Sequence, residues 1–286
     1  MLTNPNSYTR FISIIAILTV SIFITGCDTQ EEEFIEGGVT QSEIEVVTVE
    51  TAVQIEITTI PSYEVPLPTE SEVVIKEIQF CGNTADPDDA VVLSLEEALS
   101  YLALVNRCFR VSEDFLPDDL SIVDVASVNL NWGPHHLLRY TAARAVEEMF
   151  SSAYEDGLIL LASSAHRTND NQTFYFTSNV QRNGLAEAMR VSAVPGHSEH
   201  QLGLAVDITT HSLNGGLTQA FTETPEGRWV NQNAHRFGFI ISYPQNREAD
   251  TGFIYEPWHL RYVGVEVATE IFENGFILEE FLWHNK

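Results

Sequence analysis

Residues 195–207 read PGHSEHQLGLAVD, and this stretch decides both the sheet and the site of the protein. Two turn-forming residues lead into His200, and a run of small and apolar residues then ends on one carboxylate, Asp207. Residues 204–206 are suited to a buried strand. An ionised carboxylate at the end of such a strand is costly unless a cation or a metal ion pairs with it. The rest of the chain must therefore supply a partner for Asp207.

The strand expected at residues 204–208 places Asp207 on one face of a sheet together with Ala205, because side chains alternate along a strand. Ala205 is small and leaves room above that face. A turn at Gly203 would let the chain bring His200 back toward Asp207. One histidine and one carboxylate make two ligands, whereas a zinc site takes at least three ligands from the protein.

The third ligand is expected in the segment 256–259, which reads Glu-Pro-Trp-His. His259 lies in a strand-like segment, and Glu256 lies just before it. A glutamate beside a metal-bound histidine that is not itself a ligand is the usual general base of zinc hydrolases. A histidine or a Glu-x-x-His pair alone is weak evidence, since a buried histidine bonded to a backbone carbonyl is commoner than a ligand.

The joint pattern is far more specific than its parts. The chain reads Ser198-x-His200-x-x-Gly203-x-Ala205-x-Asp207, followed later by Glu256-x-Trp258-His259. This pattern resembles the bacterial zinc D-alanyl-D-alanine carboxypeptidases of the VanY type (LAS-type peptidases), and the resemblance extends from about residue 104 to residue 264. It implies a small α+β zinc peptidase fold shared with the hedgehog signalling domain. It also implies Zn²⁺ as cofactor, His200, Asp207 and His259 as its ligands, and Glu256 as the catalytic base.

The same family has a Ser-x-Tyr-Arg-Ser segment after a strand, whose arginine meets the substrate. Here the segment reads Ser164-Ala165-His166-Arg167-Thr168, with Gln172 downstream. The resemblance implies that Arg167, Gln172 and Ser198 bind substrate, and the two changed residues beside Arg167 leave the preferred peptide end open. The residues alone agree, because an arginine just after a buried strand suits a carboxylate bound through two parallel hydrogen bonds. The alternative is a surface ion pair.

The first 27 residues resemble a lipoprotein signal peptide. Residues 11–25 form a short apolar run that ends in Ile24-Thr25-Gly26-Cys27, with Arg10 as the one charge before it. A secretory apolar region followed by small residues and a cysteine predicts cleavage and lipidation at Cys27; the alternative is an uncleaved signal anchor. An exported chain permits disulfides, so Cys81 and Cys108 either form one or are two separate buried thiols.

The charge distribution excludes one class of partner and indicates a tether. The net charge of −27 excludes nucleic acid binding, which needs a basic face. No Lys or Arg occurs between Arg10 and Lys76, whereas acidic residues are frequent there. Residues 28–90 are therefore predicted to form an acidic, flexible tether, and residues 91–286 the zinc carboxypeptidase domain.

The order of periodic segments predicts an α+β fold with a small antiparallel sheet and flanking helices. Helices are expected at residues 95–107, 135–154, 171–189 with a break near Gly184, 226–237 and 265–273. Strands are expected at residues 158–162, 204–208, 239–242 and 255–263.

These observations lead to one functional expectation and three alternatives. We expect a monomeric, lipid-anchored, extracytoplasmic zinc carboxypeptidase that removes the terminal D-alanine from peptidoglycan stem peptides. The alternatives are L,D-carboxypeptidase or D,D-dipeptidase action on the same stems, or a catalytically silent zinc module that binds wall peptides. The presence of Glu256 argues against the silent module, which has no need of a base at that position.

Overall fold

The structure is a computed structural model that describes residues 86–128 and 137–285, all within one compact unit, Pro66–Lys286. The predicted signal peptide, the lipidation site at Cys27 and most of the predicted tether lie outside the described residues. Among the helices that the structure describes, none has the length and apolar character to span a membrane.

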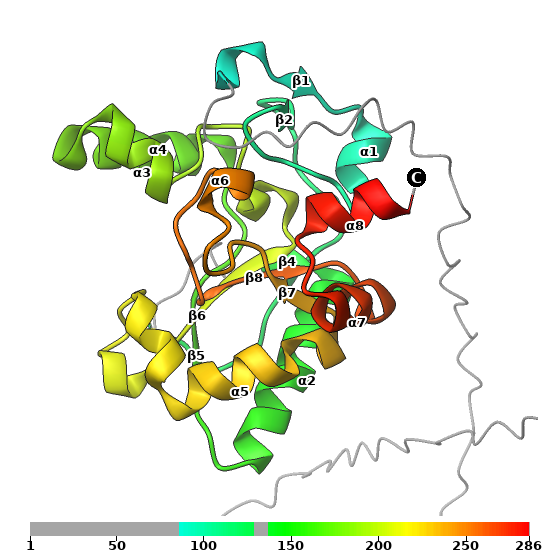
Figure 1. The fold of residues 1–286 in the computed structure, drawn as a ribbon, viewed down its shortest axis with the longest axis vertical. Coiled ribbons are helices and arrows are strands. Elements are labelled where there is room, and N and C mark those ends of the chain that lie inside the picture. The colour runs from blue at the N-terminus through cyan, green and yellow to red at the C-terminus, as the bar shows by residue number, and fades with distance from the viewer. Residues whose placement is uncertain (1–85, 129–136, 286) are drawn as a thin grey trace, which may run out of the picture. The chain divides into compact units, whose positions relative to one another are not determined.

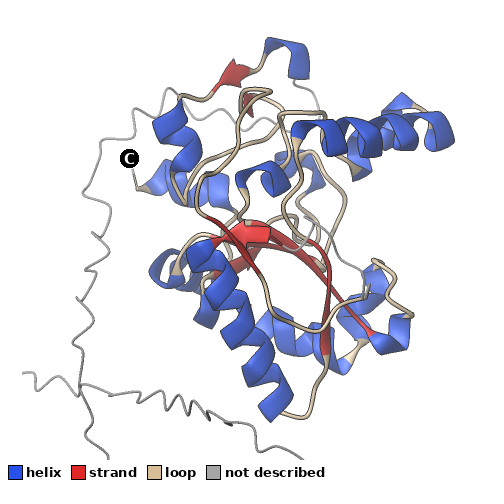
Figure 2. Ribbon diagram, turned by 180° about the vertical axis from the view of Figure 1, so that it is seen from behind, coloured by secondary structure: helices blue, strands red, loops and turns tan. Residues whose placement is uncertain are grey.

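A four-stranded antiparallel sheet forms the centre of the fold (Figures 1 and 2). Its strands are β5 (Leu160–Ser164), β6 (Ala205–Thr210), β8 (His259–Tyr262) and β7 (Phe239–Ile241), in that spatial order. Every residue of β6 and β8 is buried. Two further pairs are short: β1 (Val91–Val92) runs parallel to β2 (Phe109–Arg110), and β3 (Leu120–Ile122) runs antiparallel to β4 (Leu137–Arg139). The predicted α+β class with a small antiparallel sheet is confirmed.

Helices cover both sides of this sheet. They are α1 (Leu95–Leu99), α2 (Tyr140–Glu155), α3 (Asn169–Asn183), α4 (Leu185–Val191), α5 (Pro225–Asn233), α6 (Glu248–Thr251), α7 (Val265–Asn274) and α8 (Leu278–His284). In the orientation of Figure 1, α2 and α5 lie below the sheet, and the α3–α4 pair, α1 and α8 lie above it. The predicted break at Gly184 separates α3 from α4.

The main core forms where α2 packs against the sheet. Ala142, Val146, Met149 and Ala153 recur at helical spacing along α2, and none is exposed to solvent. They belong to one buried cluster with apolar residues of β5, β6 and β8. Burial of each large apolar side chain contributes roughly 1.5–3 kcal/mol. This packing fixes β6, and therefore Asp207, in the interior.

The prediction of a helix at residues 95–107 is wrong beyond Leu99, where α1 ends. The backbone carbonyls of Tyr101 and Ala103 accept hydrogen bonds from the buried guanidinium of Arg261. The side-chain oxygen of Asn106 accepts from the backbone N–H of Cys108 and Phe109. A side chain that bonds nearby backbone groups offers the chain an alternative to the helix. The segment is therefore irregular, and its residues are used for tertiary contacts.

Two other expected boundaries also differ from the structure. The helix predicted to start at residue 135 begins at Tyr140, because residues 137–139 pair with β3 as β4; His135 and His136 lie outside the described residues. The strand predicted from residue 255 begins at His259, because Glu256 closes a turn in which its carbonyl accepts from the N–H of His259. Cys108 is disulfide-bonded.

Candidate metal centre

Two adjacent strands and one short helix bring His200, Asp207 and His259 together. Asp207 on β6 lies directly opposite His259 on β8 in the antiparallel register. His200 lies on a short 3₁₀ helix, Glu199–Leu202, which ends at Gly203 with φ of 68°. A side chain at this left-handed position is strained, and a Cβ there would lie 2.8 Å from Leu120 Cδ2. Gly203 therefore makes the turn that carries His200 over Asp207, as the sequence predicts.

The donor atoms of the three residues are spaced as zinc ligands are. His200 Nε2 lies 3.3 Å from Asp207 Oδ2, and His259 Nδ1 lies 3.1 Å from Asp207 Oδ1. One donor atom from each residue falls within 4.8 Å of the other two, and all three residues are buried. Nitrogen and oxygen ligands about 2.1 Å from a tetrahedral zinc are about 3.4 Å apart. Two imidazoles and one carboxylate at this spacing fit Zn²⁺.

The second ring nitrogen of each histidine is already held by the protein. His200 Nδ1 contacts the carbonyl oxygen of Ala165 at 2.7 Å, which leaves Nε2 for a metal. His259 Nε2 contacts the carboxylate of Glu199 at 2.9 Å, which leaves Nδ1. Such outer partners fix the tautomer and orientation of a metal-binding histidine. The structure thus assigns one donor nitrogen to each ring.

The protonation states of the three residues differ with their surroundings. Burial and the positive charge of Arg167 lower the pKa of His200 to about 4. Burial opposes a charge on His259, but hydrogen bonds from its ring to Asp207 and Glu199 outweigh burial and raise its pKa to about 10. Burial disfavours the ionised form of Asp207. Its charge interactions and hydrogen bonds with the two histidines outweigh burial and lower its pKa strongly. Asp207 is therefore an ionised carboxylate set between two imidazoles.

Glu256 borders the same cleft but stays outside the ligand group. It lies in the turn before β8 and is buried, with 8% of its surface exposed. Burial raises the pKa of Glu256 to about 8, with the neighbouring charge of His259 acting in the opposite direction. A carboxylate whose pKa is near neutral can both accept and return a proton. A bound dication would lower that pKa.

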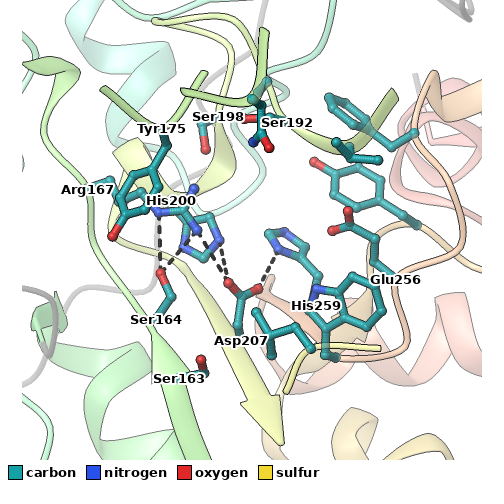
Figure 3. Close-up of a pocket in the computed structure, with 17 residues that line it drawn as sticks. Ser163, Ser164, Arg167, Tyr175, Ser192, Ser198, His200, Asp207, Glu256 and His259 are labelled. Carbon is teal, nitrogen blue, oxygen red and sulfur yellow. Dashed lines mark hydrogen bonds and ion pairs between the residues drawn. The ribbon is translucent and has the colours of Figure 1, made fainter. Parts of the chain in front are cut away.

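Arg167 lies on the other side of the three ligands from Glu256 (Figure 3). Its guanidinium donates to the hydroxyl of Ser164 and to Asp207 Oδ2, the latter at 3.3 Å. The guanidinium carbon also lies 5.0 Å from the centre of the Tyr175 ring. The arginine is therefore held in place by contacts on several sides before any ligand arrives.

The other two predicted substrate residues occupy different places. Ser198 lines the cleft. Gln172 is fully buried behind it; its side-chain oxygen accepts from Arg167, and its amide donates to the carbonyl of Ala193 at 2.7 Å. The structure places Gln172 as a support for Arg167 and not on the cleft surface. The cleft itself has a volume of about 330 Å³ and also includes Tyr175, Tyr243 and Trp258.

Sequence reasoning missed the polar residues behind His259. Glu199, Ser242 and Arg261 are all buried, and both Ser242 and Arg261 donate hydrogen bonds to the Glu199 carboxylate. A signal was present, because Glu199 lies one residue before His200 in a stretch that is otherwise suited to burial. A buried carboxylate at Glu199 needs a partner for the same reason as one at Asp207. Arg261 was hidden by the apolar alternation of the segment around it.

Comparisons with known proteins agree with this geometry. The family model described as VanY: D-alanyl-D-alanine carboxypeptidase matches residues 135–265. The Bacillus subtilis (strain 168) protein named "Putative carboxypeptidase YodJ" is 40% identical over 188 residues, which are 66% of this chain and 69% of that protein. The chain belongs to the VanY family. A "D-alanyl-D-alanine carboxypeptidase" of Enterococcus faecalis (strain ATCC 700802 / V583) is 38% identical over 48% of this chain and 52% of its own length.

Solved structures give the VanY fold directly. The LdcB LD-carboxypeptidase aligns with a TM-score of 0.65 at 39% identity over 68% of this chain and 90% of that chain. VanYB in complex with D-alanine-D-alanine aligns with a TM-score of 0.55 at 32% identity, covering 65% of this chain and 99% of that chain. A VanY variant in that set was solved with Zn(II). Zinc is accordingly the cofactor that this VanY-family site fits.

Proposed function

We propose that this chain is a zinc-dependent carboxypeptidase that removes the terminal D-alanine from peptidoglycan stem peptides. The observation that carries the proposal is the content of one cleft. The zinc ligands lie in the middle, Glu256 on one side and Arg167 on the other (Figure 3). Relatives named D-alanyl-D-alanine carboxypeptidases support the substrate class.

In this proposal Glu256 performs the proton transfers. Zinc, when bound, supplies a Lewis acid that polarises a carbonyl and lowers the pKa of water. Glu256 removes a proton from the attacking water, and the resulting nucleophile adds to the scissile carbonyl. The same side chain then delivers that proton to the leaving amine as the C–N bond breaks. A pKa close to neutral suits a group that must act in both directions.

Arg167 selects peptides that end at the scissile residue. Its guanidinium can bind a terminal carboxylate through two parallel hydrogen bonds. A continuing chain or an amide has no such anion to offer. Because the arginine is already held by Ser164 and Gln172, little side-chain entropy is lost when substrate binds. The proposal therefore includes preference for a free C-terminus.

A second candidate, L,D-carboxypeptidase action, is favoured by one specific observation. The LdcB LD-carboxypeptidase aligns over a larger share of this chain and with a higher TM-score than VanYB does. The two activities differ in the residue on the amino side of the scissile bond, which has D configuration in one substrate and L in the other.

Defined stem peptides distinguish the candidates. The zinc-loaded protein is incubated separately with a pentapeptide stem ending in D-Ala-D-Ala, a tetrapeptide stem ending in one D-Ala after an L-residue, and free D-Ala-D-Ala. Mass spectrometry of the products follows. Loss of one alanine from the pentapeptide supports the proposal. Cleavage of the tetrapeptide alone assigns the L,D activity, cleavage of the free dipeptide alone assigns a dipeptidase, and binding without any product supports a silent module.

We also propose that the protein acts outside the cytoplasm as a monomer anchored by a lipid on Cys27. The support is the apolar run at residues 11–25, the small residues before Cys27, and the lysine- and arginine-free interval that follows. An acidic, self-repelling tether would let the domain reach wall peptides at a distance from the membrane.

A further inference from the structure

A buried carboxylate lies directly behind the zinc ligand His259. Glu199 has 4% of its surface exposed, and its Oε2 atom lies 2.9 Å from His259 Nε2, on the ring edge away from Asp207. Glu199 is not one of the three residues whose donor atoms form the metal group. It is also not placed as the catalytic base, because Glu256 lines the cleft and Glu199 does not. Glu199 therefore requires an explanation of its own.

Glu199 is itself held on every side that the structure describes. The hydroxyl of Ser242 donates to Oε2 at 2.6 Å, and Arg261 Nη1 donates to Oε1 at 3.0 Å. Arg261 is wholly buried, and its Nη2 atom donates to the carbonyls of Tyr101 and Ala103. Rotation of either group would leave a buried charge without its partner, which is costly, so these bonds hold both side chains in one orientation.

The ring of His259 is confined between this carboxylate and its neighbours. Tyr243 stacks on one face, with ring centres 4.8 Å apart and planes 26° from parallel. His200 meets the ring edge-on at 4.9 Å. These contacts restrict tilting of the ring, but stacking alone does not distinguish its two flipped orientations. The bond from Nε2 to Glu199 does, because a flipped ring would lose that bond.

We propose that Glu199 is a positioning residue, which holds the proton of His259 on Nε2 and thereby presents Nδ1 to zinc. Glu199 acts through His259 and does not contact substrate. The residue thus fixes one orientation of the ligand ring before the metal arrives. The inference rests on the zinc site and not on the carboxypeptidase activity, since metal binding is measured without any substrate.

Three substitutions separate positioning from simple charge. Glu199→Asp keeps the negative charge but withdraws the carboxylate from His259 by one methylene. Glu199→Gln removes the charge and keeps the length. Glu279→Gln is the matched control, because Glu279 is another buried glutamate, with 6% exposure, that bonds Asn106 and contacts no ligand. Zinc dissociation constants are measured for full-length proteins by competition with a chromogenic chelator.

Positioning predicts that Glu199→Asp weakens zinc binding about 10-fold and Glu199→Gln by about 10- to 100-fold, the range known for outer-shell partners of metal ligands. The control should stay within about 2-fold of the wild type. A dissociation constant for Glu199→Asp within about 2-fold of wild type would overturn the proposal, because charge without position would then suffice.

The wild-type protein supplies a test that does not depend on a variant folding. With ¹⁵N-labelled histidine, the zinc-loaded protein should show His259 bound through Nδ1, with a downfield Hε2 proton that exchanges slowly. Zinc on Nε2, or an Hε2 proton that exchanges at the rate of free imidazole, contradicts the proposal. Neither measurement involves a substrate. A failure of the carboxypeptidase proposal would therefore leave the result for Glu199 unchanged.

Discussion

Asp207 and Glu256 are buried in the same cleft, yet their surroundings shift their pKa values in opposite directions. Asp207 forms hydrogen bonds and favourable charge interactions with two histidines, which keep it ionised despite burial. Burial dominates at Glu256 and raises its pKa to about 8. Carboxylates whose pKa values are separated in this way take different roles. Asp207 is suited to bind a cation and Glu256 to move a proton.

The ligand assignment predicts a loss of metal. His200→Ala, Asp207→Ala and His259→Ala should each reduce zinc from about one ion per chain to a small fraction, because a site with two protein ligands binds zinc far more weakly. Metal content after dialysis against a weak chelator, read by plasma mass spectrometry, checks this. Full occupancy in all three variants would mean that the zinc lies elsewhere. Glu256→Gln is the control that should keep the metal.

The placement of Arg167 predicts a change in selectivity. Arg167→Ala should lower kcat/KM for a stem peptide with a free C-terminus by at least about 10-fold, because a charge-assisted pair is lost. The preference for free over amidated termini should shrink with it. Steady-state rates on the matched peptides, at equal zinc content, give the comparison. A variant with undiminished preference for the free terminus would show that another group binds the carboxylate.

At the scale of secondary-structure elements, the pairing of strands and the turns between them bring the site residues together. The register of β6 against β8 sets Asp207 facing His259, and the turn at Gly203 returns His200 to the same point. Glu279 of α8 is buried, and the side chain of Asn106, in the irregular segment that follows α1, donates to it. Burial raises the pKa of Glu279 to about 7.

The Glu279 shift predicts how stability changes with pH. Its folded pKa of about 7 lies above the ordinary 4.5, so the unfolded chain releases this proton first as pH rises. The contribution to stability is complete below pH 4.5 and is lost as pH rises through 7, by roughly 3 kcal/mol for a shift of this size. Glu279→Gln should remove that slope. Urea unfolding at several pH values tests it, and parallel curves for the two proteins would refute it.

Local sequence patterns predicted most of the sheet and the site. The residues around Asp207 predicted a strand, and Gly203 predicted the turn before it. The three proposed ligands lie close enough together to bind one metal ion. The segment at residues 100–107 could not be predicted, because its carbonyls are taken by Arg261, about 160 residues away. Helical spacing describes only neighbours along the chain. The place of Gln172 behind Arg167 was likewise set by a tertiary contact with Ala193.

At the scale of the whole molecule, the chain comprises an N-terminal part, Met1–Val65, in which no Lys or Arg follows Arg10, and a compact unit, Pro66–Lys286, which contains the metal site. The whole chain carries a net charge of −27. The proposed location rests on the first 27 residues and on the lysine- and arginine-free interval that follows them. The proposed chemistry rests on the compact unit alone, so the two are tested independently.

Anchoring through Cys27 predicts a processing defect. Cys27→Ser should leave the precursor uncleaved and abolish incorporation of labelled fatty acid, because a lipoprotein signal is processed at its cysteine. Gel mobility and lipid labelling in a bacterial host provide the measurement. Labelling that persists in the variant would place the anchor at another residue. Zinc content should be the same in both proteins.

Glu256 is proposed to move the proton at a zinc site that cleaves stem peptides. The decisive measurement is D-alanine release from a pentapeptide stem, followed by mass spectrometry, for wild type and Glu256→Gln at equal zinc content. We expect the wild type to release D-alanine and the variant to do so at a rate at least about 100-fold lower, because general base catalysis is removed while metal and fold remain. Equal rates in the two proteins would contradict it.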